Sequence, residues 1–230
     1  MITYKLRQNI AVPVVKLTLR TTRLLVFENS IGLRGFIGNL FLEDNLFHNH
    51  GNNDLVYSYP RVQYKIIDGN AEIIGIAEGV DAVKSISPFE NITIGHEQIR
   101  VENIDLQESQ STIGITESQQ SYSFLTPWLA LNEKNYEKYQ KLGNWAKRKE
   151  LLEKILIGNI ISMSKSLGYT VPEPIKANIG KLEEVPTSLK GTPMLGFLGT
   201  LSVNFEIPDY WGIGKSVSRG FGTIMRCRCQ

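Results

Sequence analysis

The chain has 230 residues, of which 42% are hydrophobic and 9% aromatic, and its 25 Lys and Arg residues nearly balance 23 Asp and Glu residues. This composition excludes a mostly disordered chain, and no apolar stretch reaches the roughly 20 residues that a membrane helix needs. No signal-peptide pattern follows Met1, so we expect a soluble, cytoplasmic protein with no membrane partner. Two cysteines, Cys227 and Cys229, are too few for a disulfide framework and are interpreted as reduced thiols.

The first half of the chain predicts six elements from its hydrophobic spacing and turn residues. Asn29 or Ser30 is expected to cap the first helix, and Asp68-Gly69 predicts a tight hairpin. The elements, in order, are a strand over residues 2–19, a helix over 31–42, strands over 55–67 and 71–76, a helix over 80–86 and a strand around 98–106. This order of strand, helix, strand, strand, helix, strand is that of the ferredoxin-like unit.

The second half begins again near Ser111 with an extended stretch over residues 112–124. Asn132 and Asn144 predict the N-caps of two helices that end near residues 142 and 167. Strands are expected over residues 181–189, 195–205 and 222–229. We therefore expect an α+β fold of two tandem ferredoxin-like (RRM-like) domains, over residues 1–110 and 111–230.

Charge is distributed unevenly along the chain. Residues 1–65 hold 8 Lys and Arg against 4 Asp and Glu, a net +4, and residues 66–120 hold 2 against 10, a net −8. Residues 121–230 hold 15 against 9, a net +6. A polyanion is attracted to the first and third segments and repelled by the second, so the small total charge does not argue against nucleic acid.

The most informative segment is the Gly-rich loop, residues 212–222, which reads Gly-Ile-Gly-Lys-Ser-Val-Ser-Arg-Gly-Phe-Gly. Its glycines let the backbone approach a ligand, and we expect exposed N–H groups and basic side chains to hold phosphate. It is not a Walker loop, because Asp209 stands where that pattern requires glycine, and no βαβ unit follows for a dinucleotide. The alternative is a hairpin turn with coincidental charge.

Two of the three histidines, His48 and His50, stand in a loop-like stretch after the first predicted helix, and Tyr57 follows. A histidine there can accept or donate a proton near neutral pH, which suits general acid or base chemistry. Two alternatives remain open: a solvated loop, or a metal site completed by Asp44 or Asp54. His96, in the acidic segment, is interpreted as an ordinary surface histidine.

Together these segments resemble the CRISPR repeat-processing endoribonucleases of the repeat-associated RNA-binding superfamily. The resemblance rests on the tandem element order, the Gly-rich loop, and the run Leu33-Arg-Gly-Phe-Ile-Gly-Asn39 that leads to His48-Asn-His50 and Tyr59-Pro-Arg-Val-Gln-Tyr-Lys65. It implies metal-independent cleavage of precursor CRISPR RNA within the repeat, in which the 2′-OH attacks the adjacent phosphate. The products would be a 2′,3′-cyclic phosphate and a 5′-OH.

The resemblance also implies roles for individual residues. His50 or His48 would be the catalytic histidine, Tyr57 would assist, and Arg34, Lys65 or backbone donors would stabilise the transition state. The RNA-binding residues would be Arg34, Lys65, Gly212, Gly214, Lys215, Ser216, Ser218, Arg219, Gly220, Phe221 and Gly222. No metal or cofactor is expected.

The expected partner is CRISPR repeat RNA, with a homodimer or a CRISPR effector complex as the further assemblies considered. Two other functions are compatible with the same residues. A non-catalytic RNA-binding subunit of a CRISPR effector complex would need the loop without the histidines. A metal-dependent nuclease or phosphatase would need carboxylates beside them.

Overall fold

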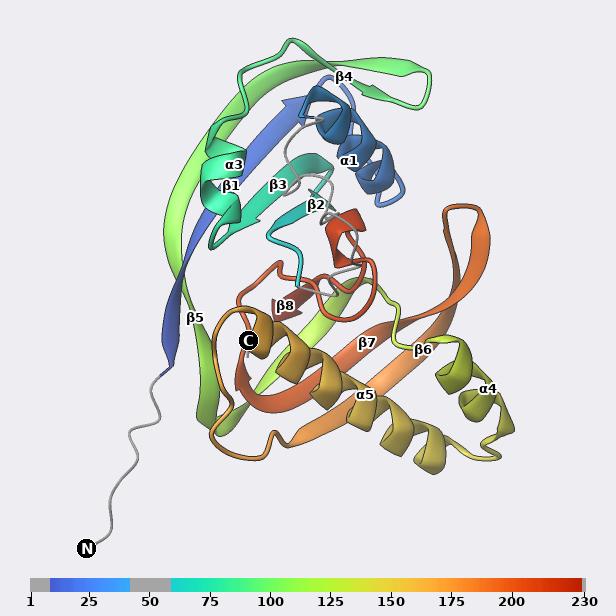
Figure 1. Ribbon diagram of the computed structural model, residues 1–230. Helices are drawn as coiled ribbons and strands as arrows, with labels where there is room; N and C mark the ends of the chain where they lie inside the picture. The colour runs from blue at the N-terminus through green and yellow to red at the C-terminus, as the bar shows by residue number, and fades with distance from the viewer. Residues whose placement is uncertain (1–8, 42–58, 229–230) are drawn as a thin grey trace, which may run out of the picture. The chain divides into compact units, whose positions relative to one another are not determined.

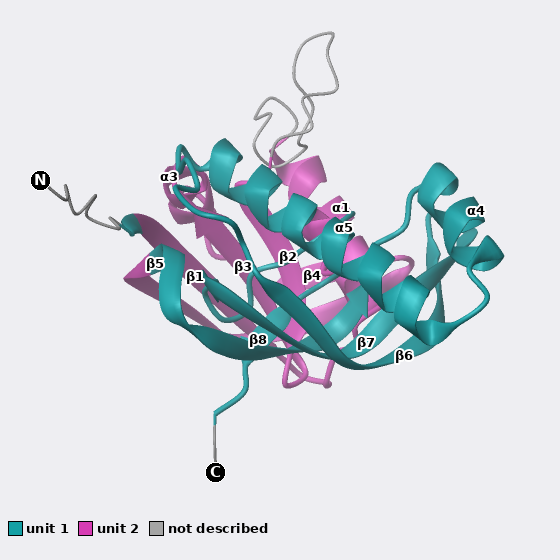
Figure 2. Ribbon diagram, turned by 90° about the horizontal axis from the view of Figure 1, so that it is seen from below, with its two compact units in different colours: residues 1–11, 112–215, 222–230 teal, residues 12–111, 216–221 magenta. Residues whose placement is uncertain are grey.

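The computed structural model describes residues 9–41 and 59–228. The chain divides into two compact units, coloured in Figure 2. Unit 1 comprises residues 1–11, 112–215 and 222–230, and unit 2 comprises residues 12–111 and 216–221. Each unit thus combines stretches that lie far apart in the sequence. The expected division into two domains at residues 110 and 111 stays a prediction. Among the described residues, no helix is long and apolar enough to cross a membrane.

The described residues of unit 2 form a sheet and helices, which Figure 1 labels. They include β1 (Ile10–Thr21), α1 (Asn29–Leu40), β2 (Val62–Ile67), β3 (Asn70–Ile76), α3 (Gly79–Lys84), β4 (Asn91–Ile94) and the start of β5 (Glu97–Trp128). Apart from β4, this is the element order predicted for the first half of the chain. The strand order is β2-β3-β1-β5, and the short β4 pairs with the start of β5.

The hairpin between β2 and β3 turns at Asp68 and Gly69, as predicted. Both residues have positive φ, 49° and 78°, and Ile67 pairs with Asn70 across the turn. A two-residue turn with positive φ at both central positions matches the twist of the flanking strands, and the Asp-Gly pair tolerates that backbone. The register of the strand pair is therefore set by local chemistry.

The start of α1 differs from the prediction. The N-cap residue is Glu28, and no side chain caps the helix. Asn29 Oδ1 instead accepts a hydrogen bond from the N–H of Val26 at 3.0 Å, and Ser30 Oγ donates to the carbonyl oxygen of Arg219 at 2.8 Å. Both candidate capping residues are thus engaged elsewhere, Ser30 by a segment distant in sequence.

Strand β5 is longer than predicted. It runs without interruption from Glu97 to Trp128, so the expected boundary at residues 110 and 111 lies within one strand. Residues 97–111 belong to unit 2 and residues 112–128 to unit 1. The hydrophilic stretch around residues 107–112 is extended because polar side chains are compatible with an exposed strand.

Unit 1 has the strand order β6-β7-β5, with β8 on the other side of β5. Its helix α5 lies along β6 and β7 in both views (Figures 1 and 2). The elements are α4 (Glu133–Lys141), α5 (Trp145–Ser166), β6 (Ala177–Leu189), β7 (Thr192–Glu206) and β8 (Ile224–Arg226). The predicted caps are confirmed: Asn132 accepts from the N–H of Asn135 and Asn144 from that of Lys147.

Each unit has its own core. In unit 2, Leu33 and Ile37 of α1 pack with Val83 of α3 against side chains of the sheet such as Tyr64. In unit 1, α5 buries its own apolar side, namely Leu152, Leu156, Ile160 and Met163. The indole of Trp128 is also buried there and donates to Asn159 Oδ1 at 3.2 Å.

Candidate nucleic-acid interface

The Gly-rich loop contributes residues to both units, since residues 216–221 belong to unit 2 and the remainder to unit 1. Within it, Val217–Arg219 form a short 3-10 helix, η1, which packs against α1 and β2. Residues in the left-handed region flank η1 on both sides, Ser216 at φ 57° and Gly220 at φ 84°. A Cβ at Gly220 would lie 2.9 Å from Ser30 Oγ, so glycine is required there for space as well as for backbone conformation.

The backbone of the loop is hydrogen-bonded within the protein, which corrects the expectation of a nest of exposed N–H groups. Five N–H groups of the loop donate to protein carbonyl groups at 2.8–3.2 Å: those of Ile213, Lys215, Arg219, Gly220 and Gly222. Their hydrogen bonds stabilise the conformation of the turn. These five N–H groups are therefore not available to a ligand, and the side chains of the loop gain importance for binding.

Two loop side chains are more deeply buried than the prediction required. Phe221 is fully buried and packs edge-to-face on Phe27, with ring centroids 4.9 Å apart. Ser218 is also buried. Phe221 therefore anchors the loop in the core of unit 2 and does not offer its ring to a ligand. Lys215, by contrast, is exposed, and Ser216 is half-buried.

The structure brings two predicted cations together in unit 2. Arg34 of α1 and Arg219 of η1 are both half-buried, and they are close enough that the charge of Arg34 contributes to the pKa of Arg219. Burial lowers the pKa of both guanidinium groups, and the charge of Arg34 lowers that of Arg219 further. Guanidinium groups stay charged in proteins, so this arginine pair, Arg34 and Arg219, is a site of concentrated positive charge. The planar guanidinium groups of such a site can bind a phosphate through bidentate hydrogen bonds.

Lys65, which the resemblance implies as an RNA-binding residue, is buried in the structure. Its side chain is fully buried in β2, and it is paired in register with Glu72 of β3. Burial lowers the pKa of Lys65 to about 7, although the negative charge of Glu72 opposes the shift. Glu72 also lies 3.6 Å from the ammonium of Lys16. Lys65 is therefore part of a buried charge cluster and not a solvent-facing phosphate ligand.

Arg226 lies in a segment, residues 211–230, that contains four cations and no Asp or Glu. In the structure it forms an ion pair with Glu206 of β7, and its guanidinium lies 5.8 Å from the ring centroid of Tyr122. Its charge is therefore compensated within unit 1. The acidic partner comes from a different strand, so counting charges along the sequence could not reveal it.

His48, His50 and Tyr57, the predicted catalytic residues, lie outside the described residues, as do Asp44 and Asp54. Over residues 9–41 and 59–228, no group of three or more His, Cys, Asp or Glu side chains is placed to hold a metal ion.

Ser30 is the site residue that sequence reasoning missed. It was interpreted as a helix cap, and nothing in the local sequence indicates its bond to Arg219.

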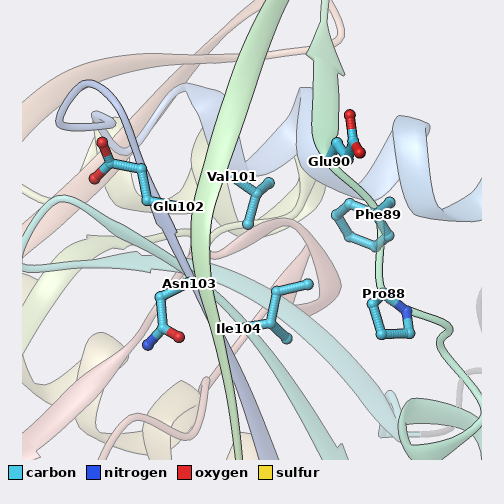
Figure 3. Close-up of a pocket in the computed structure, with 7 residues that line it drawn as sticks. All are labelled: Pro88, Phe89, Glu90, Val101, Glu102, Asn103 and Ile104. Atoms are coloured by element: carbon cyan, nitrogen blue, oxygen red, sulfur yellow. The ribbon is translucent and has the colours of Figure 1, made fainter.

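An acidic groove of about 360 Å³ in unit 2 contrasts with the arginine pair. Figure 3 shows Val101 and Ile104 on the side of β5 that faces Phe89, while Glu102 extends from the other side. Glu90 borders the same groove. Its carboxylates repel phosphate, so the groove is not a candidate for RNA binding.

Comparison with known families covers nearly the whole chain. Residues 10–112 match the Cas6b N-terminal domain and residues 114–227 match the Cas6b C-terminal domain. The fold is therefore that of an α+β protein with two Cas6b domains. The chain belongs to the Cas6b family, which confirms the resemblance seen in its sequence.

Solved structures and one curated protein are also similar to this chain. A structure described as Cas6b has 38% sequence identity and a TM-score of 0.89, covering 95% of this chain and 100% of that one. Another, described as CRISPR RNA processing endoribonuclease Cas6b, has 35% identity and a TM-score of 0.76 over the same shares. The uncharacterized protein MJ0978 of Methanocaldococcus jannaschii is 52% identical over 113 residues, which are 49% of this chain and 76% of that protein.

Proposed function

We propose that this protein is an endoribonuclease that binds CRISPR repeat RNA and cleaves precursor CRISPR RNA within the repeat. The observation that carries the proposal is the similarity, at 35% identity over 95% of the chain, to a structure described as a CRISPR RNA processing endoribonuclease. We also propose that both units are ferredoxin-like (RRM-like) modules. The strand orders β2-β3-β1-β5 and β6-β7-β5 with β8 support this assignment.

The proposed reaction needs no metal. The 2′ oxygen of one ribose attacks the adjacent phosphorus and loses its proton to a base, while the bond to the 5′ oxygen breaks and that oxygen takes a proton from an acid. The products are a 2′,3′-cyclic phosphate and a 5′-OH. His50 and His48 carry the two proton transfers in this proposal, assisted by Tyr57, because imidazole exchanges protons near neutral pH.

Negative charge on the phosphate increases during the attack, and preorganised cations stabilise it. The arginine pair is the best-supported source of that charge among the described residues, because Lys65 is buried and five N–H groups of the loop already donate within the protein. The charge of the arginine pair favours binding of the RNA backbone to unit 2, at the cleaved phosphate or at one beside it.

The test is incubation of end-labelled precursor RNA with the protein in EDTA. We expect one cut per repeat, a 5′-OH end that polynucleotide kinase labels directly, and no cut when the attacking ribose is replaced by deoxyribose. A requirement for Mg²⁺ or Mn²⁺ would contradict the mechanism. Tight binding without any cleavage would instead favour a non-catalytic RNA-binding subunit.

A further inference from the structure

A pocket of about 760 Å³ lies in unit 1, beside the beginning of the Gly-rich loop. Its volume is in the range of pockets that hold small molecules of nucleotide size. Helix α4, the β6–β7 hairpin and Lys215 form its walls. The lining residues on which the argument depends are Leu131, Glu133, Tyr136, Glu184, Met194 and Lys215.

The walls of the pocket are suited to a flat aromatic ligand. Most of the lining is apolar and includes Leu131, which precedes α4, and Met194 of β7. Tyr136 of α4 also lines the pocket, yet its side chain is 46% exposed. An exposed aromatic ring beside apolar walls provides a stacking surface, and nucleobases stack on such rings with a substantial gain in affinity.

The charges of the pocket restrict the ligand further. Lys215 is exposed, which suits it to contact a phosphate. Of the two carboxylates, Glu184 accepts a hydrogen bond from the hydroxyl of Tyr139 at 2.6 Å and forms an ion pair with Arg148. Glu133 is exposed and lies at the first position of α4. Because a carboxylate only accepts hydrogen bonds, it selects a base that presents donors.

From these features we propose that the pocket is a subsite for one unpaired guanosine nucleotide of the RNA. The base stacks on Tyr136, its N1–H and N2–H groups donate to Glu133, and the phosphate contacts Lys215. Guanine is the base whose pairing edge presents two adjacent donors to a carboxylate. This inference rests on the proposed RNA-binding function, and it adds a specificity pocket in unit 1 to the arginine pair in unit 2.

The probes are fluorescein-labelled RNA octamers: all-uridine, uridine with one central guanosine, and uridine with one central adenosine. The full-length protein should bind the guanosine octamer about 5- to 100-fold more tightly than the all-uridine octamer, the scale of one stacked and hydrogen-bonded base. Tyr136→Ala should abolish most of this preference. Met194→Trp, which fills the pocket, should do the same.

Two further variants separate the parts of the proposal. Glu133→Gln should reduce the preference for guanosine over adenosine, because an amide serves both bases as donor and acceptor. Trp145→Ala is the matched control, since Trp145 is 43% exposed on α5 and does not line the pocket. It should leave all three affinities unchanged. Thermal unfolding should show that Tyr136→Ala is folded, because nearly half of Tyr136 is exposed to solvent.

The outcomes separate this inference from the proposed function. If the wild-type protein cleaves precursor RNA in EDTA but shows no guanosine preference, or a preference that survives Tyr136→Ala, the subsite is overturned and the endoribonuclease stands. If the preference depends on Tyr136 but precursor RNA is never cleaved, the subsite stands and the catalytic proposal fails. Equal loss of affinity for all octamers in Tyr136→Ala would also overturn the subsite.

Discussion

The hydroxyl of Ser30 donates a hydrogen bond to the carbonyl oxygen of Arg219 at 2.8 Å, across 189 positions of sequence. Ser30 lies in the first turn of α1, and Arg34 follows on the same helix. The bond therefore fixes η1 against the helix that supplies the other arginine. Because the Ser30 side chain is fully buried, water cannot replace it as a donor at low cost.

Replacing Ser30 with Ala should weaken both stability and RNA binding. We expect a loss of about 1 kcal/mol in the free energy of unfolding, the usual contribution of one buried hydrogen bond, and a severalfold loss of RNA affinity because Arg219 is less well positioned. Ser85→Ala is the matched control. It removes a hydroxyl that donates to Ala82 O at 2.7 Å in the same unit, far from the loop in sequence. An equal loss of RNA affinity in both variants would contradict the positioning role.

The arginine pair should determine part of the salt dependence of RNA binding. If Arg34 and Arg219 each neutralise one phosphate, changing both to Ala should flatten the slope of log affinity against log salt by about 1.4 for single-stranded RNA. Fluorescence anisotropy over a salt series measures it. Arg23→Ala is the control, because Arg23 already forms an ion pair with Glu97 at 2.6 Å in the same unit. An unchanged slope in the double variant would place the phosphates elsewhere.

Cleavage should depend on the predicted histidines far more than binding does. His50→Ala should slow single-turnover cleavage by about 10²- to 10⁴-fold, the usual contribution of one general acid or base, while RNA affinity stays within severalfold. His48→Ala should have a smaller effect if His50 is the principal group. Wild-type rates in both variants at saturating enzyme would refute this assignment of the active site.

Lys65 should make stability depend on pH. Its pKa is about 7 in the folded protein against 10.5 in the unfolded chain, so between these values the unfolded chain holds a proton that the folded protein lacks. The contribution of Lys65 to stability therefore improves as pH rises through this window and is unfavourable below pH 7.

Lys65→Met should consequently stabilise the protein most near pH 6.5. This gain should shrink between pH 7 and pH 10 by up to about 1.4 kcal/mol per pH unit, as measured by urea unfolding. Lys84→Met, at an exposed position in the same unit, should show no such trend over this range. A gain that does not vary with pH would mean that Lys65 keeps its proton when folded.

Local chemistry determined which parts of the fold could be predicted. Asp68-Gly69 forms the expected turn because its backbone preference resides in those two residues. Asn132 and Asn144 cap their helices because the N–H groups that donate to them lie three positions away. Ser30 can also cap a helix, but its hydroxyl instead donates to the carbonyl oxygen of Arg219, which is distant in sequence. A tertiary contact overrode the local preference.

In the candidate site, too, some features could be predicted from the sequence and others depend on tertiary contacts. Arg34 and Arg219 could be chosen from the sequence as cations in a glycine-containing context, but their proximity is a product of the fold. The burial of Phe221 and Lys65 could not be predicted, because burial is not visible in a short motif. An aromatic residue in a glycine-rich loop serves equally well as a base platform or as a core anchor, and only the packing of Phe27 decides between them.

Unit 2 takes its last residues, 216–221, from almost the end of the chain. A ribosome that stops before residue 216 therefore releases a product without η1, in which Arg34 has no arginine neighbour from that segment and Ser30 has no Arg219 carbonyl to bind. Folding of this unit cannot finish before residues 216–221 are made, because the contact between Ser30 and Arg219 spans 189 positions of sequence. The order of synthesis thus makes the arginine pair form only after this second, distant segment has been translated.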